Sequence, residues 1–412
     1  MEKQNCKGMH DLLPVDMASF RSIENIFLNY CYKYGYKEVR TPTLEYLHLF
    51  TAIGTLTPST LNRVYSFLDW DGWSGERVVL RPDGTIPVAR LYIDNMNQRE
   101  TVKLCYVTNI FAFEATGNEN RERWQCGAEF IGGNRLAADA EIISLASDLM
   151  NSFGIETVNL QLSHAGLIKA LVKEIALTAE EETSLIDHVL DGDWQSLLER
   201  GETENMNKLL NLLINLKGTS SNFLQNVKNL YPQASLALTS NIDDFINITK
   251  LLDELNCKYE IDMKSIRNFE YYTGVCFQLS ADSKKIGGGG RYDDLIPLMK
   301  GGNHPACGFA LYIDSIMKST SLGEKEGRDQ TILIKSGSTK PEIIKNCFDL
   351  AQNLRKNDYS VDMQFADKEL ADYCWIVSIY EKNPNDYDIF NQQRQQHYSA
   401  VSINEVIKVL HQ

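Results

Sequence analysis

A long block of almost wholly helical sequence, residues 167–255, is the feature that most constrains the fold of this chain. Apolar residues within the block recur at the three- and four-residue steps of amphipathic helices. Segments typical of β-strands precede it at 103–113 and 124–131, and strand-like sequence resumes after it at 259–263 and 272–279. We therefore interpret the block as a helical insertion in a domain of the α+β class.

The remaining chain predicts a second, smaller domain. A length of 412 residues suits two to three domains. The segment 321–329 is charged and contains glycine, which predicts a linker after a core domain over residues 1–320. Beyond the linker, strand and helix patterns alternate, so we expect a small α/β domain over 330–412. We also predict a final helix of the core domain from about residue 309 to residue 318.

Composition narrows the class of function. Lys and Arg number 41 against 55 Asp and Glu, and the net charge of −14 argues against a general electrostatic grip on nucleic acid, although a local basic groove stays open. No apolar run approaches the ~18 residues of a membrane span, and the start of the chain lacks a signal core, so we expect a cytoplasmic protein. The nine scattered cysteines and seven histidines form no CxxC or HExxH motif, so neither a metal site nor a cofactor is expected.

The segment Trp-Gln-Cys-Gly-Ala-Glu at 124–129 carries the most informative local pattern. Side chains alternate along a strand, so Gln125, Gly127 and Glu129 share one face. Two long hydrogen-bonding side chains around a glycine predict a cleft with a polar wall and open space above Gly127. The alternative is that this face is simply solvated.

Three further segments carry weaker signals. The turn Arg-Pro-Asp-Gly-Thr places Asp83 and Thr85 at a strand end, where a carboxylate can meet an ammonium group, although an ordinary turn has the same sequence. The glycine run 287–290 lacks the Lys-Ser/Thr of a phosphate loop and indicates only a bend or a close approach of the backbone. Residues that would clamp a ligand, but that taken alone are more typical of core and surface, are Arg267, Tyr271 and Tyr272.

Taken in order, these segments resemble the histidyl-tRNA synthetases and their paralogues. The blocks that carry the resemblance are KGMHDLLP at 7–14, GYKEVRTP at 35–42, LRPDGT at 80–85, the strand at 124–129, RNFEYYTG at 267–274, GGGRYD at 288–293 and PACGFA at 305–310. The resemblance implies the class II aminoacyl-tRNA synthetase core, an antiparallel sheet with flanking helices that is normally dimeric through the segment around Pro42. The insertion lies where this family carries one. The tail from 330 resembles its anticodon-binding domain in a short and degenerate form.

The resemblance also assigns seven residues to a histidine pocket: Asp83, Thr85, Gln125, Glu129, Arg267, Tyr271 and Tyr272. It implies that Asp83 and Thr85 hold the α-amino group of histidine. Gln125 and Glu129 would contact the amino acid's backbone groups and its imidazole, and the paired tyrosines would close over the imidazole. Arg267 corresponds to the catalytic arginine of the family.

The departures from the family pattern fall where its members bind ATP. Arginine suits phosphate because its planar donors grip phosphate oxygens bidentately and stay charged. Ala112 and Ser315 stand where the family has its two nucleotide-binding arginines, and Tyr312 replaces a glycine that lets the nucleotide approach the backbone. The loss of one such donor commonly raises the barrier by ~3–4 kcal/mol, so adenylation should be nearly abolished.

A chain that retains the histidine-binding residues of the family but lacks its ATP-binding arginines fits a sensor of histidine. The paralogues that fit it are regulatory subunits of ATP phosphoribosyltransferase, the first enzyme of histidine biosynthesis. The resemblance implies a chain without catalysis of its own, which activates a short catalytic subunit, mediates feedback by histidine, and self-associates as a dimer within a hetero-oligomer that does not bind tRNA. Two alternatives stay open: a divergent, working histidyl-tRNA synthetase, and a tRNA-binding scaffold built on an inactive core.

Overall fold

The chain divides into two compact units, Met1–Leu322 and Gly323–Gln412, and each is described by itself. The computed structural model describes residues 5–51, 63–69, 75–113, 120–155, 157–190, 192–200, 204–215, 217–230, 235–265, 271–320, 322, 331–364, 373–381 and 383–411. Of the predicted linker at 321–329, only Leu322 lies within these residues.

A nine-stranded sheet forms the centre of the described part of unit 1, in the order β1-β5-β6-β12-β11-β10-β7-β9-β8. Its strands are β1 (Lys37–Glu38), β5 (Thr101–Phe111), β6 (Glu122–Gly132), β7 (Asn159–His164), β8 (Lys217–Gly218), β9 (Glu260–Asp262), β10 (Val275–Ala281), β11 (Lys284–Arg291) and β12 (Ala306–Tyr312). Neighbouring strands are antiparallel except in the pairs β1 with β5 and β7 with β9. The predicted α+β class with a mainly antiparallel core is therefore confirmed.

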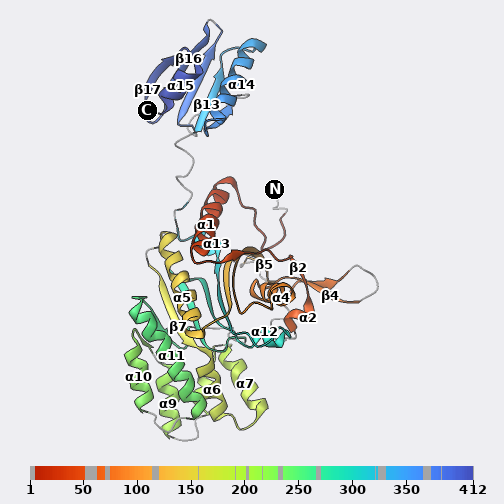
Figure 1. Cartoon of the computed structure of the whole chain (residues 1–412), viewed down its shortest axis with the longest axis vertical. Coiled ribbons are helices and arrows are strands. Elements are labelled where there is room, and N and C mark those ends of the chain that lie inside the picture. Colours follow the sequence, from red (N-terminus) through yellow and green to blue (C-terminus); the bar gives the residue numbers. More distant parts are fainter. Residues whose placement is uncertain are drawn as a thin grey trace. The chain divides into compact units, whose positions relative to one another are not determined.

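Helices cover both faces of this sheet (Figure 1). One face packs against α1 (Pro14–Lys33), α5 (Arg135–Ser152) and α13 (Ile313–Met317), and the other faces α4 (Thr85–Asn95) and α12 (Leu295–Leu298). The side-chain alternation of β5 divides the two cores: Cys105 and Val107 join the core under α1, and Leu104 and Tyr106 join the core under α4. The second of these faces carries the cavity described below.

The helical insertion lies between β7 and β9 (Figure 1, green). It consists of α6 (Ala165–Ile175), α7 (Ala179–Leu190), α8 (Gln195–Leu198), α9 (Glu204–Ile214), α10 (Ser221–Leu230) and α11 (Leu236–Glu254), together with strand β8. Helix α6 begins at a cap in which His164 Nδ1 accepts a hydrogen bond from the Leu167 amide, 3.0 Å away. On the same helix, Lys169 Nζ donates to the main-chain oxygen of Tyr272 at 2.7 Å. The insertion is thus tied to the segment that carries the paired tyrosines.

A small three-stranded sheet, β2-β4-β3, leads into the predicted ammonium-binding turn. Its strands are β2 (Leu44–Tyr46), β3 (Ser66–Leu68) and β4 (Arg77–Leu80), and α2 (Leu47–Thr51) follows β2. The buried Arg81 directly follows β4 and donates to the carbonyls of Thr41 at 2.8 Å, Pro42 at 2.9 Å and Asn109 at 2.7 Å. One guanidinium therefore fixes the start of the turn to two other segments.

The predicted helix over 309–318 is wrong in its first half. Residues through Tyr312 form β12, which pairs with β6 on one side and β11 on the other, and only Ile313–Met317 is helical. Phe309 and Leu311 are buried in the core under α1, and the intervening Ala310 lies on the opposite face, so the apolar period is two. Pairing on both sides satisfies the backbone of a segment whose sequence does not exclude a helix.

Unit 2 is built on a five-stranded sheet in the order β14-β13-β15-β16-β17. Its elements are β13 (Thr331–Ser336), α14 (Pro341–Arg355), β14 (Ser360–Met363), β15 (Trp375–Tyr380), β16 (Asn383–Asn391), β17 (Gln396–Ala400) and α15 (Ile403–Leu410). Strand β13 runs parallel to both of its neighbours, and β15 to β17 are antiparallel. Across the described residues of both units, no helix has the length and apolarity needed to cross a membrane.

Candidate functional site

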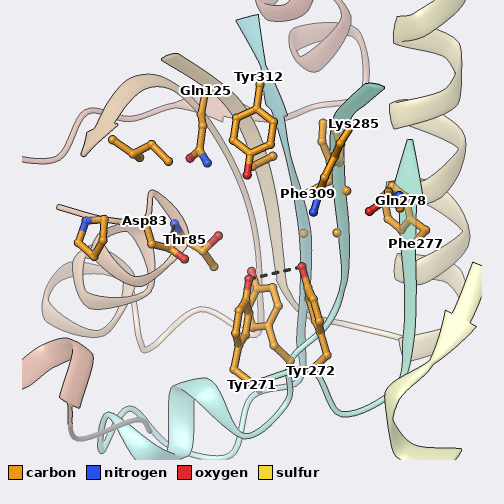
Figure 2. Close-up of a pocket in the computed structure, with 17 residues that line it drawn as sticks. Asp83, Thr85, Gln125, Tyr271, Tyr272, Phe277, Gln278, Lys285, Phe309 and Tyr312 are labelled. Atoms are coloured by element: carbon orange, nitrogen blue, oxygen red, sulfur yellow. Dashed lines mark hydrogen bonds between the residues drawn. The ribbon is translucent and has the colours of Figure 1, made fainter. Parts of the chain in front are cut away.

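A cavity of 190 Å³ opens on the α4 side of the large sheet (Figure 2). Five of the seven predicted pocket residues line it: Asp83, Thr85, Gln125, Tyr271 and Tyr272. A sixth, Glu129, lies beneath the cavity lining at Gly308. The seventh, Arg267, lies outside the described residues. The sequence patterns thus identified residues from three separate segments of the chain, and the fold brings these residues together around one cavity.

Asp83 lies at the N-terminus of α4, where its Oδ1 accepts hydrogen bonds from the amides of Thr85 and, at 3.1 Å, Ile86. These bonds favour the charged carboxylate, but burial disfavours it more strongly, and the pKa of Asp83 is raised. A carboxylate that burial holds out of water gains from a cationic partner. The turn can therefore receive an ammonium group, as its sequence suggested.

Gln125 contributes an unused acceptor to the cavity. The residue is 6% exposed, and its Oε1 has no hydrogen-bond partner in the described part of the chain. A buried polar atom left unpaired costs roughly 1–3 kcal/mol. A ligand that donates a hydrogen bond to this oxygen recovers that free energy, which makes Gln125 a site for an N–H or O–H group.

The open space predicted above Gly127 is filled, so that prediction is wrong. Tyr106 lies directly opposite Gly127 in the pairing of β5 with β6. A Cβ atom placed on Gly127 would overlap the Tyr106 phenol, and so would one on Gly84. The glycines thus make room for a tyrosine of the protein and not for a ligand. Register between two strands decides this, and the pattern within β6 alone does not reveal it.

Glu129 lies behind the cavity lining in a cage of tyrosines. It is 1% exposed, and it accepts hydrogen bonds from the hydroxyls of Tyr106, at 3.2 Å, and Tyr292. Its Oε2 lies against Gly308, where a Cβ atom would overlap it. Burial raises the pKa of Glu129 to about 8, although the hydrogen bonds from Tyr292, Thr85 and Tyr106 oppose the change. The group is therefore mostly protonated at neutral pH and is poised to respond to a nearby charge.

Tyr271 and Tyr272 form an aromatic wall (Figure 2). Their ring centroids are 4.6 Å apart and their hydroxyls 3.4 Å apart, and the Tyr271 ring also packs on Tyr292 at 5.7 Å. Burial raises the pKa of both tyrosines, so they stay neutral. A flat, uncharged wall beside two carboxyl groups suits a small planar ring that can donate hydrogen bonds.

The edge of the cavity beside Tyr312 is filled by a stack of two side chains. The guanidinium carbon of Arg123 lies 3.6 Å from the centroid of the Tyr312 ring, and its Nη2 lies 3.5 Å from Ser315 Oγ. Asp314, next to Ser315, accepts from the Trp124 amide at 3.2 Å. The tyrosine and arginine thus occupy an edge that a glycine would leave open.

Comparisons with known proteins agree with the resemblance found in the sequence. The family model described as histidyl-tRNA synthetase matches residues 8–316. An ATP phosphoribosyltransferase regulatory subunit of Dehalococcoides mccartyi is 47% identical over 93% of this chain and 92% of its own length. A histidine–tRNA ligase of Methanococcus aeolicus is 30% identical, with 88% of this chain and 87% of the ligase covered.

Solved structures show the same fold. A Bacillus halodurans protein described as an ATP phosphoribosyltransferase regulatory subunit/histidyl-tRNA synthetase matches with a TM-score of 0.78 and 22% identity, covering 92% of this chain and 98% of that one. A histidyl-tRNA synthetase from Nostoc matches with a TM-score of 0.77 and 15% identity, covering 100% of this chain and 99% of its own. The class II synthetase fold predicted from the sequence is therefore confirmed.

Proposed function

Because the chain belongs to the histidyl-tRNA synthetase family, and within it to the regulatory subunits of ATP phosphoribosyltransferase, we propose that its cavity binds histidine as a regulatory signal. The observation that carries the proposal is the cavity itself. Within it, the Asp83 carboxylate and the unpaired Gln125 oxygen stand beside a wall of neutral tyrosines. An acceptor for an ammonium group, an acceptor for a further donor and a flat wall together suit histidine.

Each pocket residue has a distinct role in this proposal. Asp83 and Thr85 receive the α-ammonium group at the start of α4. The imidazole packs on the tyrosine wall, and Glu129, lying under Gly308, takes up or releases charge in response to it. The side-chain oxygen of Gln125 accepts a hydrogen bond from an N–H group of the amino acid. Arg267, which lies outside the described residues, keeps in this proposal the histidine-binding role that its motif implies.

We further propose that the site does not activate histidine. Ala112 and Ser315 lack the cationic donors that an ATP-binding site needs, and Arg123 is engaged with the ring of Tyr312. The chain would then act on a short-form catalytic subunit, which it activates and to which it transmits the histidine signal, in the cytoplasm. Unit 2 would be a degenerate anticodon-binding domain with no tRNA to read.

Transmission requires that histidine bind more tightly to one state of the complex than to another, because equal affinity shifts no equilibrium. The hydrogen bond from Lys169 to the Tyr272 carbonyl supports one route for this coupling. A ligand that fixes the tyrosine wall also fixes the start of the helical insertion. In this proposal, histidine binding in the cavity is transmitted through the tyrosine wall to the whole helical insertion.

Co-purification tests the regulatory role. When the chain is expressed with the short catalytic subunit from the same genome, we expect the two to elute as one complex. That complex should form phosphoribosyl-ATP faster than the catalytic subunit alone, and added histidine should slow it. Separate elution at micromolar concentrations, with no gain in rate on mixing, would contradict the proposal.

The chain should also associate with itself. The three-stranded sheet beside Pro42 exposes three large apolar side chains on one face, each 43–47% accessible: Leu44, Tyr46 and Phe67. Such a cluster is typical of a surface covered by a partner, and two-fold pairing is the commonest form. We expect sedimentation to show a dimer that Phe67→Glu weakens. A species of 46.8 kDa alone, at micromolar concentration, would argue against this surface.

A further inference from the structure

A β-bulge at Ile286 places a lysine in the cavity. Along β10, Leu279 pairs with Gly287, but the next residue, Ser280, pairs with Lys285, so β11 carries one extra residue. The extra residue, Ile286, is fully buried in the core under α1. Without this extra residue, strand alternation would direct Lys285 to the other face of the sheet, away from Gln278 and Gly288. The bulge brings all three to the same face, where each lines the cavity.

Lys285 brings a positive charge that nothing in the described protein neutralises. Its side chain points into the cavity from the side across from Asp83 (Figure 2). Among the described residues, no carboxylate forms an ion pair with Lys285. The residue as a whole is exposed to solvent. Partial desolvation and, to a smaller extent, the nearby positive charge of the Arg123 guanidinium lower the pKa of Lys285. An anionic group at this point would relieve both effects.

The charges of the cavity therefore form a dipole. The Asp83 carboxyl group lies on one side, and the Lys285 ammonium lies on the other (Figure 2). A free amino acid is a zwitterion with the complementary arrangement. Its ammonium group can meet Asp83 only if its carboxylate points away from that carboxyl group.

From this arrangement we propose that Lys285 binds the α-carboxylate of the amino acid and makes the pocket specific for the free acid. This inference rests on the proposed histidine site and adds to it the residue that reads the carboxylate. In adenylate formation this carboxylate attacks the α-phosphate of ATP, displaces pyrophosphate and becomes a mixed anhydride with AMP, so a lysine that holds it as a free carboxylate suits a sensor of the free amino acid.

A comparison of two ligands tests the inference. L-histidinol carries a hydroxymethyl group in place of the carboxylate of L-histidine, and both are titrated calorimetrically into the full chain. We expect the wild type to prefer histidine by about ten- to a hundred-fold, the usual worth of a charge-assisted hydrogen bond. Lys285→Gln should weaken histidine by that factor and change histidinol little, so that the preference collapses. Lys285→Arg should retain most of it.

Lys284→Gln is the matched control, since Lys284 pairs with Ala281 and does not line the cavity, and it should leave both affinities unchanged. Equal weakening of both ligands by Lys285→Gln, or no change in either, would overturn the role of Lys285 while leaving a histidine site in place. Failure of the wild type to bind either ligand would instead overturn the histidine site itself, and the inference with it.

Discussion

The purified chain is expected to show no histidine-dependent exchange of pyrophosphate into ATP. Ala112 and Ser315 stand where two phosphate-binding arginines would be needed, and each missing donor commonly reduces the rate by about 10²–10³-fold. The two losses together should leave the exchange about 10⁴–10⁶-fold below that of a working synthetase. An intact histidyl-tRNA synthetase assayed alongside supplies the positive control. Exchange at a rate typical of that enzyme would favour the alternative of a divergent synthetase.

Glu129→Gln is expected to stabilise the protein at alkaline pH. Because the pKa of Glu129 is raised to about 8 in the folded chain, the folded state keeps a proton that the unfolded state releases above its ordinary pKa of 4.5. Stability from this group is therefore present at low pH and lost as the pH rises from 4.5 through 8. At about 1.4 kcal/mol per pKa unit, the wild type should lose at most about 5 kcal/mol across this window. The glutamine variant does not titrate and escapes that loss.

At pH 8.5, where the Glu129 carboxyl group is ionised, the same variant should bind histidine about ten- to a hundred-fold more weakly, since an amide cannot supply the charge of a carboxylate to the imidazole. Thermal unfolding and calorimetric titration of one preparation, at pH 5.5 and pH 8.5, give both results. Glu174→Gln, at an exposed position on α6, is the control and should change neither. A stability difference from wild type that does not grow with pH would show that Glu129 is ionised in the fold. Unchanged histidine affinity would remove it from the site.

Patterns local to the sequence predicted much of the fold and of the cavity lining. Alternation along β6 placed Gln125 and Glu129 on one face, and the turn before α4 identified Asp83, because each depends on residues a few positions apart. Pairing between strands decided the rest. The register of β5 with β6 places Tyr106 over Gly127, and the bulge in β11 turns Lys285 into the cavity.

The helix predicted over 309–318 failed for the same reason. An apolar run of that length fits either a helix or a strand, and only the two flanking strands select the strand. The burial that raises the pKa of Glu129 likewise depends on residues from distant segments, among them Tyr292, which lies 163 positions away in the chain. No signal confined to one segment could reveal it.

The inhibition of the reconstituted complex by histidine tests the account most directly. Phosphoribosyl-ATP formation is measured over a range of histidine concentrations, with complexes that contain either the wild-type chain or Glu129→Gln. We expect both to assemble and to turn over alike without histidine, with the variant requiring about ten- to a hundred-fold more histidine for the same inhibition. Equal inhibition of the two complexes, with equal histidine binding to the two isolated chains, would contradict the claim that this cavity senses histidine.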